Sequence, residues 1–151
     1  MRPSLIAALA ASRSGIAAVE FALTAPVLAA MMIVVADFGM AAYQQMEVRN
    51  AAQAGAEYAV IKGWNSAAIS GAVTGATGLT GLAANPAPVQ SCGCPTGTAI
   101  TAATCNSTCA AGGTAGTYVT VSAQSSYSTL IAYPGVTSPM TLSATSVVRI
   151  K

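Results

Sequence analysis

The feature that most constrains this chain is an apolar run near its N-terminus. Residues 16–36 are apolar or small apart from Glu20, Thr24 and Pro26. A helix of that length, at about 1.5 Å per residue, covers roughly 31 Å, which matches a bilayer hydrocarbon core of about 30 Å. Asp37 ends the run. We therefore expect residues 16–36 to cross a membrane, where packing against neighbours tolerates a proline and the helix kinks.

The charges around this run predict its orientation. Arg2 and Arg13 precede it, and no cation follows until Arg49. The excess of cations on the cytoplasmic side of spans places the N-terminus inside and the remainder outside. A cleaved secretory signal peptide is the alternative. The apolar run is longer than the usual core of such a signal, about 7 to 15 residues, and it contains a carboxylate at Glu20, so we favour the span.

Composition argues against catalysis. Hydrophobic residues make up 54% of the 151 residues and charged residues 7%, whereas an ordinary soluble domain has about 25% charged residues. The sequence has no histidine, and the few acids fall in one predicted helix: Glu20, Asp37, Glu47 and Glu57. We therefore predict that the chain is not an enzyme and takes no metal, cofactor or small-molecule substrate. A net charge of +2 also offers no basic surface for nucleic acid.

The start of the apolar run carries a specific pattern, which reads Arg13-Ser14-Gly15-Ile16-Ala17-Ala18-Val19-Glu20-Phe21-Ala22-Leu23. This segment resembles the leader junction of type IV pilin-like proteins, especially the TadE-like pseudopilins of the tight-adherence (Tad, or Flp) pilus. Three further stretches resemble other parts of that family: Asp37-Phe38-Gly39, residues 50–59 and the end of the chain at residues 142–149.

The resemblance implies processing and a function. A prepilin peptidase would remove a leader, residues 1–15, by cutting after Gly15, and Glu20 would become the fifth residue of a mature chain that begins at Ile16. The protein would then be a pseudopilin or minor pilin in the bacterial inner membrane, where it meets other pilin subunits and helps assemble a surface pilus for adhesion or secretion. The alternative is a permanently membrane-anchored external binding module.

Glu20 is the residue for which two interpretations differ most. It lies about 6 Å along the helix from Ile16, near the cytoplasmic interface. The carboxylate could simply reach the headgroups, or it could pair with the new α-amine of a neighbouring subunit. We favour the second interpretation, because an ionisable group within a membrane span is a functional candidate by default.

Beyond the membrane the helix is expected to continue, so that it covers residues 16–61. One face carries mostly small residues at helical spacing: Ala41, Val48, Ala52, Gly55 and Ala59. Small side chains allow close approach, either of the chain's own sheet or of another helix in a filament. Lys62 and Gly63 form a helix stop. A short second helix is predicted over residues 65–76, with Asn65 or Ser66 as its N-cap.

Four cysteines lie on the predicted external side, at positions 92, 94, 105 and 109. External thiols are oxidised, so we predict two disulfides rather than a zinc site. A bridge between Cys92 and Cys94 would close a cramped ring. Each is therefore expected to bond to Cys105 or Cys109, and the spacing leaves both of these pairings open.

The C-terminal third alternates like sheet, with strands expected near residues 117–127 and 140–150 and a turn at Pro134-Gly135. The predicted fold class is α+β: one long N-terminal helix, half of it in the membrane, packs on a small antiparallel sheet with a disulfide-pinned loop. Residues 62–151 would form the external head, with the cysteine loop at residues 92–109.

Overall fold

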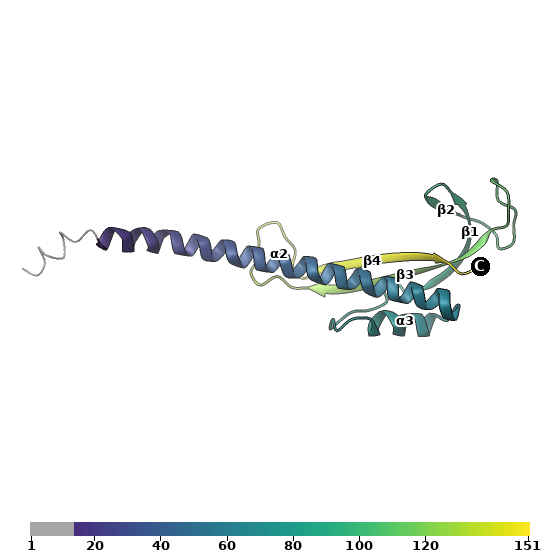
Figure 1. Ribbon diagram of the computed structural model, residues 1–151, viewed down its shortest axis with the longest axis horizontal. Helices are drawn as coiled ribbons and strands as arrows, with labels where there is room; N and C mark the ends of the chain where they lie inside the picture. The colour runs from purple at the N-terminus through teal and green to yellow at the C-terminus, as the bar shows by residue number, and fades with distance from the viewer. Residues whose placement is uncertain (1–13) are drawn as a thin grey trace, which may run out of the picture. The chain divides into compact units, whose positions relative to one another are not determined.

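The computed structural model describes residues 14–151 and divides the chain into two compact units, Met1–Gly39 and Met40–Lys151. Helix α2 (Ser14–Lys62) contributes to both units (Figure 1). The prediction placed this helix over residues 16–61. The predicted leader, residues 1–15, lies outside the described residues except for Ser14 and Gly15, and Arg2 and Arg13 lie outside them as well.

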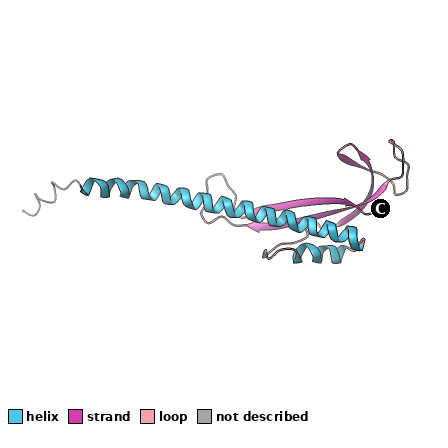
Figure 2. Ribbon diagram, viewed as in Figure 1, coloured by secondary structure: helices cyan, strands magenta, loops and turns pink. Residues whose placement is uncertain are grey.

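The second unit combines helices with one antiparallel sheet, which confirms the predicted α+β fold class. The outer half of α2 is followed by a short helix, α3 (Ser66–Gly75). The sheet has the strand order β2-β1-β3-β4 (Figure 2). Its strands are β1 (Val89–Thr96), β2 (Ala99–Ala102), β3 (Gly116–Tyr127) and β4 (Met140–Arg149).

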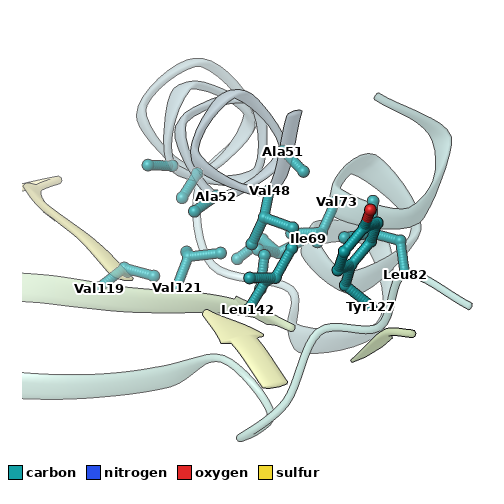
Figure 3. Close-up of a cluster of buried hydrophobic side chains, with 13 residues drawn as sticks. Val48, Ala51, Ala52, Ile69, Val73, Leu82, Val119, Val121, Tyr127 and Leu142 are labelled. Carbon is teal, nitrogen blue, oxygen red and sulfur yellow. The ribbon is translucent and has the colours of Figure 1, made fainter. Parts of the chain in front are cut away.

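Strand β3 organises the core, because it pairs with both β1 and β4 and buries most of its length. Its register with β4 places Val119 opposite Val148 and Ala123 opposite Ala144. Valines 119 and 121 are fully buried, and Leu142 of β4 joins them. Figure 3 shows these side chains meeting residues of α2 and α3 in one cluster. The alternation read in the sequence therefore places Val119 and Val121 in the core, but in β3 the opposite face is largely buried as well, with Tyr118 at 8% and Ser122 at 7% exposure.

The small-residue face of α2 packs on the chain's own sheet and on α3. Val48, Ala52 and Ala59 are all buried in the core cluster. Gly55 marks the closest approach, since a Cβ added there would lie 2.5 Å from a methyl of Val73 and 2.8 Å from a methyl of Val121. The sequence left open whether this face packs on the chain's own sheet or on another helix in a filament. The structure shows packing on the chain's own sheet and on α3.

The end of α2 and the start of α3 follow the sequence signals. Gly63 adopts φ +82° and donates its N–H to the Ala59 carbonyl at 3.0 Å, a left-handed cap that few other residues accept without strain. Asn65 then caps α3, where its side-chain oxygen accepts a hydrogen bond from the Ala68 N–H at 3.1 Å. The turn between the helices is therefore fixed at both ends.

The sequence predicted a loop at residues 92–109. In the structure part of this segment forms strands. Cys92 and Cys94 lie in β1, which pairs with β3 through contacts such as Gln90 opposite Val119. The strands β1 and β2 were missed because Gly93 and Pro95 interrupt any period-two pattern, and pairing with distant β3 overrides that local signal. The turn at Pro134-Gly135 is present, within a longer connection of residues 128–139.

Candidate functional site

The first half of α2 presents an apolar surface that no other part of the described residues 14–151 covers. From Gly15 to Ala36 every residue is exposed except Ala25, which is half-buried. Among residues 14–151, α2 is the one helix long and apolar enough to cross a membrane, with a mean hydropathy of 2.2 over its most apolar window and none of that window buried. Apolar surface of this extent is unfavourable in water, so lipid or other protein has to cover it.

The candidate processing junction lies at the start of this helix. Gly15 is the second residue of α2, and Ile16, the expected first residue of the mature chain, is 70% exposed. A Cβ added at Gly15 would meet nothing within 4 Å. No packing within the described residues therefore requires glycine at this position, and a requirement for it would have to come from a processing enzyme.

Glu20 is the one charge on the exposed apolar surface between residues 15 and 36. Its side chain is exposed, and it projects from the second turn of the helix. No residue from 14 to 39 buries Glu20, so within that range the carboxylate is accessible to a group that approaches from outside.

Thr24 and Pro26 show how the apolar segment accommodates its other exceptions. The Thr24 hydroxyl donates to the Glu20 carbonyl at 3.0 Å and approaches the Phe21 carbonyl at 3.3 Å, so its polar group is satisfied within the helix. Helix α2 continues through Pro26 although proline cannot donate a backbone hydrogen bond. Both residues are therefore compatible with an apolar environment. Asp37, which ends the run, is only 1% exposed.

The four cysteines form two disulfides that cross between β1 and the following loop. Cys92 bonds to Cys105 and Cys94 bonds to Cys109, with Cα–Cα distances of 5.1 Å and 5.6 Å. The prediction of two crossing bridges is confirmed, and the structure selects one of the two pairings left open. Each bridge closes a loop long enough to stabilise the fold by about 3 kcal/mol through restriction of the unfolded chain.

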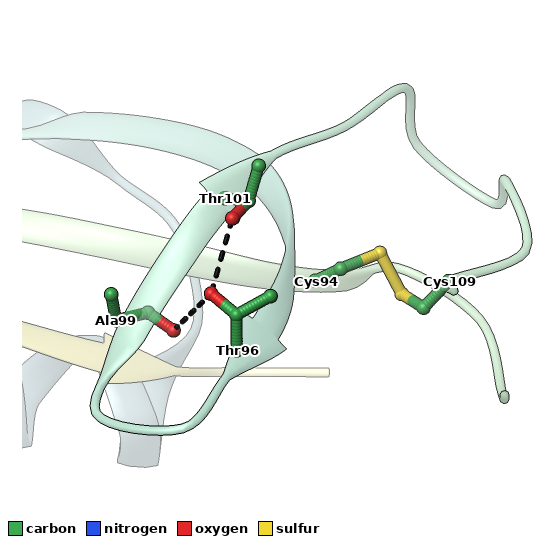
Figure 4. Close-up of a disulfide and its surroundings, with 5 residues drawn as sticks. All are labelled: Cys94, Thr96, Ala99, Thr101 and Cys109. Atoms are coloured by element: carbon green, nitrogen blue, oxygen red, sulfur yellow. Dashed lines mark hydrogen bonds between the residues drawn. A yellow bond between two sulfur atoms is a disulfide. The ribbon is translucent and has the colours of Figure 1, made fainter. Parts of the chain in front are cut away.

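The disulfides also hold a hairpin in place. Figure 4 shows the Cys94–Cys109 bridge beside the turn between β1 and β2. Across that turn the Thr96 hydroxyl donates to the Ala99 carbonyl at 3.4 Å and lies 3.1 Å from the Thr101 hydroxyl. All four sulfurs are used in bridges, so the segment supplies no free thiol for redox chemistry or for a metal.

Sequence reasoning missed the depressions on the second unit. One of them has a volume of about 330 Å³ and lies between the first turns of the outer half of α2 and residues 78–80. Met40, Tyr43, Gln44 and Glu47 line its helix side. Their spacing of three and four residues could have marked a shared helix face, but nothing local predicts that residues 78–80 fold back against it.

Comparison with known protein families gives a match in the first part of the chain. The family model described as TadE-like protein matches residues 15–57, which confirms the resemblance seen at the junction and along α2. No curated protein and no solved structure matches the chain.

Proposed function

We propose that this chain, whose residues 15–57 match the TadE-like family model, is a pseudopilin or minor pilin that takes part in assembling a Tad/Flp-type surface pilus for adhesion or secretion. The observation that carries the proposal is the exposed apolar half of α2, which begins at a glycine junction and carries Glu20 in its second turn. Such a helix can leave a bilayer only if other subunits cover it.

In this proposal the chain enters the bacterial inner membrane with its N-terminus in the cytoplasm and its head outside. A prepilin peptidase then cuts between Gly15 and Ile16. The cations Arg2 and Arg13 on the N-terminal side support this orientation, and the two disulfides fit an oxidising external compartment.

Glu20 would set the register of assembly. Cleavage creates a positive α-amine at Ile16, and the amine of an incoming subunit would pair with Glu20 of a subunit already docked. An unpaired charge buried between apolar helices costs several kcal/mol, which is enough to reject a shifted arrangement. The exposure of Glu20 in the single chain supports this, because the carboxylate has to be reachable from outside.

The proposed role is structural and not catalytic. The chain lacks histidine, and its four carboxylates all belong to α2, so a serine or threonine nucleophile in the head would have neither a histidine nor a carboxylate from the sheet as its base. The head would act through its surface, by contact with other subunits.

Intact-mass analysis of the chain purified from bacterial membranes tests the proposal. The expected mass is that of residues 16–151 with four fewer hydrogen atoms than the reduced form, because two disulfides are present. A Gly15→Val variant should keep the mass of the full chain, since it removes the residue before the cut. A wild-type chain that stays uncut would favour the anchored binding module, and a cut near Ala30 would favour a secretory signal peptide.

A further inference from the structure

One edge of the sheet lies beside a polar groove. Strand β4 forms this edge, and Figure 1 shows it running along the outer half of α2. We define the β4 groove as the depression of about 360 Å³ between the α2 residues Gln45, Arg49, Ala52 and Gln53 and residues 143–146 of the strand. All of these residues belong to the second unit. The groove therefore leads a neighbouring molecule to the backbone of an edge strand.

The backbone of β4 turns hydrogen-bonding groups toward this edge. Antiparallel pairing alternates between residues whose N–H and C=O face the partner strand and residues whose groups face away from it. Ser143 lies opposite Gln124, whose groups bond to Ala83 on the other side of β3, so the groups of Ser143 face outward. Thr145, two residues on, repeats this orientation. Within the described part of the chain, the one partner of these outward groups is the Gln45 side-chain amide, which donates to the Ser143 carbonyl at 2.9 Å.

The sequence of β4 does not protect its edge. Natural edge strands are commonly short, or carry lysine, proline or a bulge, and these features prevent pairing with other chains. Strand β2, the other edge of the sheet, has only four residues. Strand β4 has ten residues, carries neither a charge nor a proline before Arg149, and pairs with β3 without interruption from Met140 to Arg149. A long, regular edge of this kind is suited to the addition of another strand.

Charge indicates which kind of strand the groove accepts. Arg49 is the one charged residue among those that line it, and it forms no ion pair within the residues that the structure describes. An added strand alternates its side chains between two faces, so every second side chain would lie on the α2 side of the sheet. A carboxylate on that face would pair with Arg49. The β4 strand of a second copy would bring no such group, because residues 140–149 contain no acid.

We propose that β4 binds an extended segment of another protein, which adds as an antiparallel strand and places an aspartate or glutamate beside Arg49. Antiparallel addition continues the pairing of the other strands in this sheet. The inference concerns the head alone, so it goes beyond the proposed function and can hold or fail independently of it.

The alternation of β4 fixes how the segment has to lie. Leu142 and Ala144 pack with the core cluster on the α2 side, so Ser143 and Thr145 carry their side chains on the other face. In an antiparallel pair, directly opposite residues have their side chains on the same face. The segment residues that bond to Ser143 and Thr145 therefore point away from α2. The acidic residue lies between them, and its own N–H faces outward.

Peptide binding to the full chain in detergent tests the strand addition. The probe is a fluorescent peptide of about nine residues that alternates valine and threonine around a central aspartate, and fluorescence anisotropy measures its binding. N-methylation of the two residues that flank the aspartate removes N–H groups that bond to β4, so it should weaken binding at least about tenfold. N-methylation of the aspartate itself removes an outward N–H and should change the affinity less than about twofold. Equal effects, or no binding of the unmodified peptide, would overturn strand addition, and the reversed pattern would overturn the antiparallel direction.

Variants of β4 test the same contact from the side of the protein. Thr145→Pro removes an outward N–H at an edge position where proline is tolerated, and it should weaken peptide binding about fivefold. Thr145→Val is the matched control. It also loses the hydroxyl that lies 3.1 Å from the Ser122 hydroxyl, but it keeps the backbone N–H and should bind like wild type. Trp64 fluorescence verifies that both variants are folded. Equal weakening by the two folded variants would contradict a backbone bond at Thr145.

Arg49→Gln tests the charge. It should weaken binding of the aspartate peptide about threefold, the size expected of an exposed ion pair, and leave binding of a peptide with asparagine at its centre unchanged. Lys62→Gln, which removes an exposed cation outside the groove, should change neither affinity. If Arg49→Gln leaves both affinities unchanged or lowers both equally, the acidic segment is wrong. If the chain without peptide is a dimer that the peptide dissociates, a second copy occupies β4 and the proposal is overturned.

Discussion

Gly55 is the residue on which the packing of the head depends most closely. It lies where α2 passes over both α3 and β3, and the methyl groups of Val73 and Val121 occupy the space that a side chain would need. A glycine within a helix costs about 1 kcal/mol relative to alanine, so its presence is unfavourable unless packing offsets it. Here the offset is the close contact of three elements, which also explains why this helix face is built from small residues.

Gly55→Ala should therefore destabilise the head although alanine is the better helix former. The added Cβ meets branched side chains fully buried in the core, and overpacking of this kind costs about 1 to 3 kcal/mol. Gly71→Ala is the matched control, because that exposed position of α3 has nothing within 4 Å and should gain up to about 1 kcal/mol. Denaturant unfolding followed by Trp64 fluorescence compares the two. Equal effects would show that space at Gly55 is not limiting.

At the scale of elements, the backbone hydrogen bonds fix which way each residue of β4 faces. Gln124 of β3 exchanges two backbone bonds with Ala83, at 2.8 Å and 2.9 Å, so its N–H and C=O point away from β4. The residue opposite Gln124 is Ser143, so the backbone N–H and C=O of Ser143 point away from β3, to the edge of the sheet that β4 forms. At this edge the Gln45 side-chain amide donates to the Ser143 carbonyl at 2.9 Å. The next residue, Ala144, points back to Ala123 of β3.

This alternation predicts opposite tolerance of proline at adjacent positions. Ser143→Pro removes an N–H that faces the free edge, where proline is accepted, and should cost about 1 kcal/mol. Ala144→Pro removes a bond to β3 and places the ring against that strand, so it should cost at least about 3 kcal/mol. Thermal unfolding of the two variants beside wild type measures the difference. Similar losses at both positions would contradict this alternation, and a larger loss for Ser143→Pro would mean that the register between β3 and β4 is shifted by one residue.

The elements differ in how far the sequence could predict them. Helix α2 and the strands β3 and β4 carry periodic patterns long enough to be read locally, and Asn65 supplies a cap for α3. The hairpin of β1 and β2 has no such pattern, because its pairing with β3 and its two disulfides bring together residues far apart in the chain. The depression between Met40, Tyr43, Gln44 and Glu47 of α2 and residues 78–80 was not predictable for the same reason.

At the scale of the whole molecule, charge is sparse and placed unevenly. All four acids belong to α2. Three of the four cations in the second unit, Lys62, Arg149 and Lys151, come at the ends of α2 and of the chain. With so few charges on an otherwise apolar or small surface, each one has a large effect on which neighbours are accepted. Glu20 is the extreme case, because no other charge lies on the exposed apolar half of the helix.

We propose that this chain is an assembling subunit whose Glu20 selects the register of its neighbours. The most direct measurement is co-purification of partner pilins with Glu20→Ala, beside wild type and Glu20→Asp, from membranes of the same cells. Glu20→Ala should enter the membrane and be cut after Gly15 as usual, yet it should recover at least about tenfold less partner, since an unpaired amine costs several kcal/mol when buried. Glu20→Asp, which keeps the charge, should recover part of the binding. Normal recovery of partners by Glu20→Ala would contradict the account.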